Sequence, residues 1–135
     1  MPSSVSLHCE SGERIPRRKD LIKLARRVVR AERLQGEVNL VFCPDARVRA
    51  LNRQYRGLDR VTDVLSFSWD EEGFAGEIFI ANPQARRQSK RFNNNYFNEL
   101  RRLIVHGLLH LCGYDHVKTR DLKIMRKKED FYLAS

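Results

Sequence analysis

Three of the four histidines in this chain lie within one segment, HGLLHLCGYDH, at positions 106, 110 and 116. Apolar residues recur at helical spacing over residues 99–112, so the side chains of His106 and His110 should project from one helix face, close enough to bind one metal ion. Gly113 follows, where a left-handed residue can end a helix and bring His116 back beside the pair. The segment therefore predicts a metal site on His106, His110 and His116.

The ligand set indicates which chemistry the metal would serve. Three neutral imidazoles leave a coordination position open, which is typical of a catalytic zinc site. We expect one Zn²⁺ ion, although imidazoles also accept nickel, copper and iron. The histidine spacing resembles that of metzincin proteases, but those proteases carry Glu after the first histidine, where this chain has Gly107. Without that general base the site favours attack on a phosphodiester over hydrolysis of a peptide.

Phosphodiester cleavage also needs a cation that stabilises the charge developing on the phosphate oxygens. The segment YRGLDRVTDVLSF, residues 55–67, begins as a turn-rich stretch that supplies Arg56 followed by Gly57, which allows the backbone to approach a ligand. Arg53 and Arg60 lie nearby, so spacing alone leaves the choice among these arginines open. We take Arg56 as the candidate catalytic residue.

The charge of the chain indicates a polyanionic partner. Lysine and arginine total 26 against 17 acidic residues, for a net charge of +9. The basic residues concentrate in three stretches, residues 14–33, 86–102 and 118–128, which favour a nucleic acid over a membrane because none stands beside an apolar anchor. No apolar run is long enough to span a bilayer and the first residues lack a signal-peptide core, so we expect a cytoplasmic protein that does not contact membranes. Three cysteines without CxxC spacing predict small buried thiols.

The hydrophobic pattern predicts one domain over residues 1–135. Its fold class is α+β, with a mixed four-stranded sheet and about five helices. Strands are expected over residues 5–9, 37–43, 64–69 and 77–81, the last two as a hairpin. Helices are expected from Pro16 to about Val29, over residues 45–55, weakly over 84–92, and over residues 99–112 and 118–133.

Three motifs together resemble the YbeY family of rRNA maturation endoribonucleases: YRGLDRVTDVLSF, then GEI at Gly76–Ile78, then HGLLHLCGYDH. The resemblance covers residues 51–129. It implies a zincin-like helix, a metal ion, usually zinc, on His106, His110 and His116, and a catalytic arginine at Arg56. It further implies single-strand-specific RNA cleavage, maturation of the 3′ end of small-subunit (16S) rRNA, ribosome quality control, and contacts with the small ribosomal subunit and its assembly factors.

The chain departs from the family pattern at a few positions. Glu77 replaces the usual Asp of the GDI segment, Ser68 and Trp69 replace a more typical Pro-Phe, and Cys112 replaces a usual Leu. The hairpin loop, residues 70–75, is short for the family, so a substrate contact made by a longer loop would be lost.

Two other functions remain open at this stage. A non-catalytic RNA-binding assembly factor with a structural metal fits the lack of an evident general base. A metalloprotease fits the histidine spacing but is disfavoured by Gly107. We expect a monomer.

Several further side chains allow both a functional and a structural interpretation. Asp115 could orient a histidine or satisfy a turn, and Thr62 and Asp63 could line a cleft or end a loop. Phe67, Trp69 and Phe79 could stack on unpaired bases, but aromatic residues in strands mostly belong to the core. We expect Phe67 and Phe79 in the core and Trp69 as the exception that could stack on a base.

Overall fold

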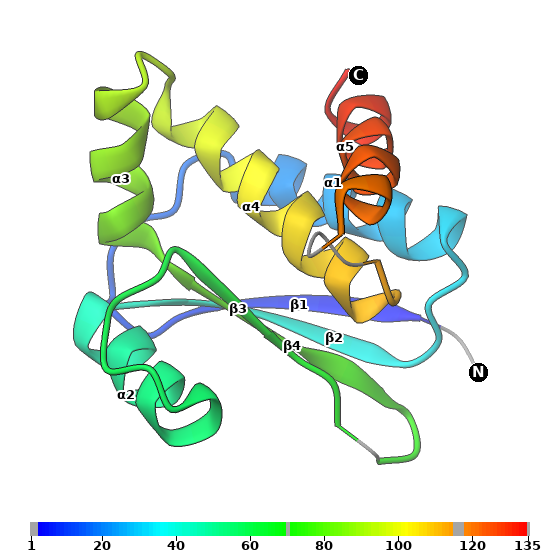
Figure 1. Ribbon diagram of the computed structural model, residues 1–135, viewed down its shortest axis with the longest axis horizontal. Helices are drawn as coiled ribbons and strands as arrows, with labels where there is room; N and C mark the ends of the chain where they lie inside the picture. The colour runs from blue at the N-terminus through cyan, green and yellow to red at the C-terminus, as the bar shows by residue number, and fades with distance from the viewer. Residues whose placement is uncertain (1–2, 70, 115–117, 135) are drawn as a thin grey trace.

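A four-stranded mixed sheet forms the centre of the computed structural model, which describes residues 3–69, 71–114 and 118–134. The strand order is β1-β2-β4-β3; β1 and β4 both run parallel to β2, whereas β3 is antiparallel to β4 and lies at an edge (Figure 1). The strands are β1 Ser4–Cys9, β2 Glu37–Cys43, β3 Val64–Phe67 and β4 Phe74–Ala81.

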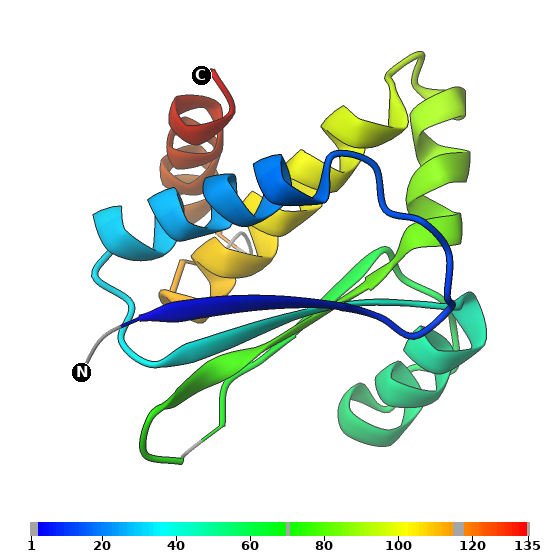
Figure 2. The same ribbon diagram turned by 180° about the vertical axis from the view of Figure 1, so that it is seen from behind.

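Helices cover both faces of this sheet. Helices α1 and α4 lie on one face with α5 packed against α4, α2 lies on the opposite face, and α3 connects β4 to α4 (Figures 1 and 2). The helices are α1 Arg18–Ala31, α2 Asp45–Arg56, α3 Asn82–Arg91, α4 Tyr96–Leu111 and α5 Thr119–Leu133.

The core divides into two clusters because successive side chains of a strand point to opposite faces of the sheet. On the α4 face, Phe42 and Ile78 belong to the larger cluster, and both are fully buried. On the α2 face, Phe67 and Phe79 pack with Leu51 of α2 in the smaller cluster. The cavity described below is lined by residues of the edge strand β3, of α4 on one face of the sheet and of α2 on the other.

The predicted fold class is confirmed: the described residues form a single α+β domain with a mixed four-stranded sheet and five helices. Element boundaries differ by a few residues, most clearly at the first helix and at the hairpin. The first helix begins at Arg18, after Arg17 adopts a left-handed conformation (φ 49°). Strand β4 begins at Phe74, earlier than expected, because Phe74 pairs with the parallel strand β2 across the sheet. Strand β3 ends at Phe67, two residues before the expected end, so the hairpin connection is shifted toward the N-terminus and keeps a similar length.

The three cysteines form no disulfide bond with one another. All three are free; Cys43 is buried, as predicted, whereas Cys9 and Cys112 are partly exposed, which the prediction of buried thiols did not anticipate. Burial raises the pKa of Cys43 to about 12 and that of Cys112 to about 11. Both thiols are therefore protonated at neutral pH. In the described segments, no helix combines the length and apolarity required to cross a membrane.

Candidate metal and active site

His106 and His110 lie on consecutive turns of α4, and their rings meet edge to face with an interplanar angle of 72°. The two Nε2 atoms are 3.2 Å apart and the ring centroids are 4.7 Å apart. Two nitrogens bound to one tetrahedral ion at about 2.0–2.1 Å would themselves be about 3.3 Å apart. The geometry of the pair therefore fits two ligands of one ion.

Glu129 of α5 orients the first of these histidines. Its Oε1 atom lies 2.7 Å from Nδ1 of His106, and the two side chains are only 17% and 22% exposed. An imidazole that donates its Nδ1–H to a carboxylate keeps the lone pair on Nε2, which is the atom that faces His110. The family resemblance extended to residue 129 but did not predict this role for Glu129.

The end of α4 agrees with the predicted stop. The helix ends at Leu111, and Gly113 adopts φ 97°, a left-handed conformation that favours glycine. Its backbone N–H donates to the carbonyl of His110 at 3.0 Å. His116 and Asp115 lie outside the described residues, within which no group of three or more His, Cys, Asp or Glu side chains is placed to hold a metal ion. The third ligand therefore stays a prediction.

Arg56 is the last residue of α2, whereas the sequence pattern placed it in a loop. Gly57 ends the helix with φ 71°, and the Arg56 guanidinium donates to the backbone carbonyl of Ser66 in β3 at 2.9 Å. Arg56 thereby lines the same cavity as the histidine pair, while Arg53 faces a different cavity. The cavity has a volume of about 470 Å³ and is lined by Arg56, Thr62, Asp63, Val64, Leu65, Ser66, Ser68, His106, His110 and Leu111.

Gly107 allows α4 to pack directly on the sheet. A Cβ atom at this position would lie 2.7 Å from Cγ2 of Ile78 and 3.1 Å from Oγ of Ser66. The Ser66 hydroxyl donates to the carbonyl of Gly107 at 3.0 Å, which joins β3 to α4 beside the cavity. A glutamate at this position, as in metzincins, would collide with the sheet, so the geometry argues against the protease motif.

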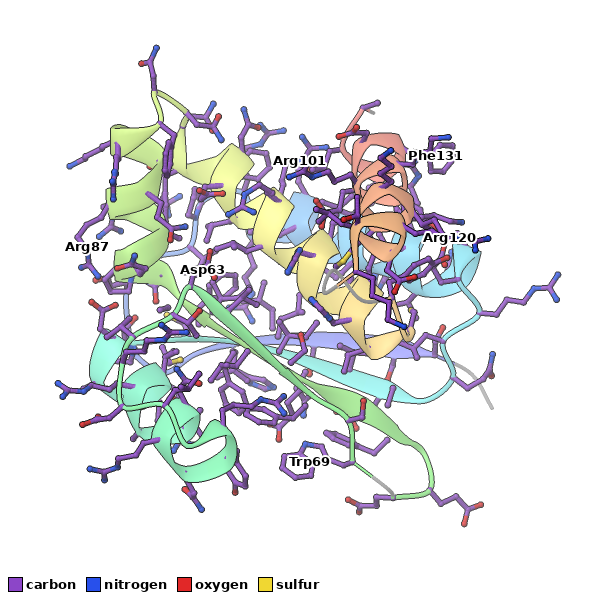
Figure 3. The ribbon with its side chains drawn as sticks, viewed as in Figure 1. Asp63, Trp69, Arg87, Arg101, Arg120 and Phe131 are labelled. Atoms are coloured by element: carbon purple, nitrogen blue, oxygen red, sulfur yellow. The ribbon has the colours of Figure 1, made fainter. Side chains whose placement is uncertain are left out.

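A polar network lies next to the histidines. Asp63, at the cavity wall, accepts a hydrogen bond from Gln88 at 3.1 Å and lies 3.5 Å from the guanidinium of Arg102. Arg102 also pairs with the buried Glu99. Figure 3 shows Asp63 at the loop that enters β3, facing α3 and α4. The spacing of Glu99, Arg102 and His106 places them on one face of α4, so the sequence could have grouped these three, but not Asp63 or Gln88.

The family model described as Endoribonuclease YbeY matches residues 7–135. The chain belongs to the endoribonuclease YbeY family. Among curated relatives with that name, the Desulforamulus reducens protein is 37% identical over 87% of this chain and 88% of its own length. The Pelotomaculum thermopropionicum protein is 42% identical over 84% of this chain and 82% of its own length.

The YbeY family match begins at residue 7 and so extends beyond the resemblance seen in the sequence motifs, which began at residue 51. The solution structure of TM1509 from Thermotoga maritima covers 96% of this chain and 86% of its own, with a TM-score of 0.69 and 32% identity. The fold is therefore shared over nearly the whole chain.

Proposed function

We propose that the chain is a metal-dependent endoribonuclease that cleaves single-stranded RNA at the cavity between α2, β3 and α4. The observation that carries the proposal is the convergence on this one cavity of Arg56 with His106 and His110, a pair distant from it in sequence. Membership of the endoribonuclease YbeY family supports the reaction class. The net charge of +9 supports a polyanionic substrate.

The histidines would hold the metal, which we propose to be one Zn²⁺ ion with His116 as the third ligand. A bound ion would supply Lewis acidity at the scissile phosphate. His106 presents its Nε2 lone pair because Glu129 accepts from the other ring nitrogen. His110 presents its own Nε2 atom 3.2 Å away, on the next turn of the same helix.

Arg56 would stabilise negative charge on the phosphate. Its bond to the Ser66 carbonyl uses one guanidinium nitrogen and anchors the side chain against the edge strand. A guanidinium has five N–H donors, so the donors that remain can bind phosphate oxygens. A cation held in advance of the reaction stabilises developing charge without reorganisation.

The biological assignment follows from the family resemblance. We propose that the substrate is the 3′ end of 16S rRNA, in maturation and ribosome quality control, and that the partners are the small ribosomal subunit and its assembly factors. We further propose a cytoplasmic monomer.

The test is cleavage of a single-stranded RNA spanning the 3′ end of 16S rRNA by zinc-loaded protein, compared with His110→Ala and Arg56→Ala variants whose fold is verified by circular dichroism. We expect both variants to lose cleavage, while metal content measured by atomic emission falls only in His110→Ala. Chelation should stop cleavage and added zinc should restore it.

Arg53→Ala is the matched control, because Arg53 lies one turn before Arg56 but faces another cavity. This variant should cleave as the unaltered chain does. Equal cleavage by all variants would indicate a contaminating nuclease and contradict the proposal. Binding of RNA without cleavage, with unfolding on metal removal, would instead favour the non-catalytic assembly factor.

A further inference from the structure

Four aromatic side chains gather on the α2 face of the sheet, beside Arg56. We define the aromatic platform as Tyr55, Phe67, Trp69 and Phe79. Phe67 is at its centre, with ring centroids 5.2 Å from Tyr55, 5.8 Å from Trp69 and 5.8 Å from Phe79. Phe67 and Phe79 are buried, as predicted for core aromatics, so they form the floor of the platform.

Tyr55 and Trp69 are the exposed members of the platform. They are 48% and 36% exposed, and their centroids are 6.2 Å apart in an edge-to-face arrangement. Trp69 is stacked on Phe67 with an interplanar angle of 21°, and its indole N–H donates to Glu77 at 3.0 Å. The indole is therefore held in one orientation while part of its surface faces solvent (Figure 3).

Arg56 connects the platform to the cavity. Its guanidinium carbon lies 4.9 Å from the centroid of the Phe67 ring, and its donor reaches Ser66, which lines the cavity with His106. Arg56 thus reaches around the edge strand β3, with the histidines on its α4 side and the aromatic platform on its α2 side. A strand whose phosphate binds at Arg56 would bring an adjacent base over Trp69.

We propose that Tyr55 and Trp69 form a stacking subsite for an unpaired base of RNA next to the phosphate that is cleaved, a proposal that rests on the proposed function. A base is the occupant that the surroundings favour, because a phosphate-binding guanidinium adjoins exposed rings of the kind on which unpaired bases stack. The same arrangement would select single strands, since paired bases do not expose their faces.

The test uses the fluorescence of Trp69, the only tryptophan in the sequence. The metal-free protein is titrated with a single-stranded oligoadenylate of about ten nucleotides, a length within the range bound by known single-strand sites. An RNA duplex of the same length and an abasic strand that retains the phosphates are titrated in parallel. We expect the oligoadenylate to quench the tryptophan emission strongly, and the duplex and the abasic strand to quench it weakly.

Affinity is measured separately by anisotropy of an end-labelled strand. Tyr55→Leu and Trp69→Leu should each weaken binding of the oligoadenylate by about tenfold, the scale of one base–aromatic stack. In cleavage assays with zinc, both variants should raise KM more than they lower kcat. Phe131→Leu is the matched control: Phe131 is 62% exposed with Arg27 5.5 Å from its ring centroid, but it projects from α5, away from the cavity (Figure 3).

The outcomes separate the two proposals. Binding or cleavage of the oligoadenylate with unchanged tryptophan emission, or equal quenching by the abasic strand, would overturn the stacking subsite and leave the nuclease intact. Quenching and binding without cleavage under any metal would retain the subsite and contradict the nuclease. Absence of binding to every strand, together with absence of cleavage by the zinc-loaded protein, would overturn both.

Discussion

Glu129 of α5 and His106 of α4 lie 2.7 Å apart through Oε1 and Nδ1, although 22 residues separate them in the chain. This contact ties the last helix of the domain to the candidate metal site. The carboxylate fixes which ring nitrogen of His106 carries the proton and increases the basicity of the other. The last helix therefore contributes to metal affinity without supplying a ligand.

Replacement of Glu129 tests this role. Glu129→Gln keeps the size of the side chain and removes its charge, so we expect zinc affinity to fall about 10- to 100-fold while the fold is preserved. The measurement is a zinc titration against a competing chelator. Asp130→Asn, an exposed acid on the next position of α5, is the control and should leave the affinity unchanged. Equal affinity in both variants would contradict the positioning role of Glu129.

The close packing at Gly107 predicts a stability loss. Gly107→Ala adds a Cβ atom 2.7 Å from Ile78, and we expect the free energy of unfolding to decrease by about 1–3 kcal/mol. The change opposes the helix propensity of alanine, which in an open position would add about 1 kcal/mol. Urea denaturation measures the difference, with Asn98→Ala at an exposed position of α4 as the control. A more stable Gly107→Ala protein would show that the helix is not packed as closely as described.

Glu32, which follows α1, joins three elements through its carboxylate. It accepts hydrogen bonds from Tyr114 at 2.8 Å, from Lys128 at 3.3 Å and from Tyr132. Burial raises the pKa of Glu32, but the hydrogen bonds from Tyr132, Tyr114 and Lys128 outweigh it, so the pKa lies below its ordinary value. Because the folded-state pKa is lower than the unfolded one, this stabilisation is present above the unfolded pKa and is lost as pH falls through the folded pKa.

A pH series of the Glu32→Gln variant tests that conclusion. We expect the variant to be less stable by about 1–3 kcal/mol at neutral pH, and the difference to shrink as the solution becomes more acidic than the ordinary glutamate pKa. Urea denaturation at each pH gives the values. Glu10→Gln, which removes an exposed pair with Arg47, should cost at most about 1 kcal/mol. A difference for Glu32→Gln that grows toward acid pH would contradict the assignment.

The guanidinium of Arg56 is predicted to matter for its shape as well as its charge. Arg56→Lys retains a cation but loses the planar fork that can bind the Ser66 carbonyl and a phosphate together. We expect single-turnover RNA cleavage to slow by about 100-fold, with little change in metal affinity. Arg53→Lys should cleave at the rate of the unaltered chain. If Arg56→Lys also cleaves at that rate, charge alone suffices and the fork has no role.

Local sequence determined the parts of the site that depend on one helix. The four-residue spacing of His106 and His110 fixes their common face once a helix forms, and Gly113 sets where that helix ends. The alternation of apolar residues likewise determined the strands, so the α+β class and the family motifs could be predicted from the sequence.

Tertiary structure alone decided which distant groups meet. Hydrophobic periodicity carries no information about contacts between distant segments, so it did not indicate that Glu129 reaches His106. Nor did it indicate that β3 lies at the edge of the sheet, where Arg56 can bind its backbone. The exposure of side chains was decided in the same way. Phe67 and Trp69 are two residues apart, so the sequence pattern places them on the same face of the strand. Packing against α2 buries Phe67 and leaves Trp69 partly exposed to solvent. The physical reason is that these contacts depend on how the helices close over the two faces of the sheet, which no local pattern specifies.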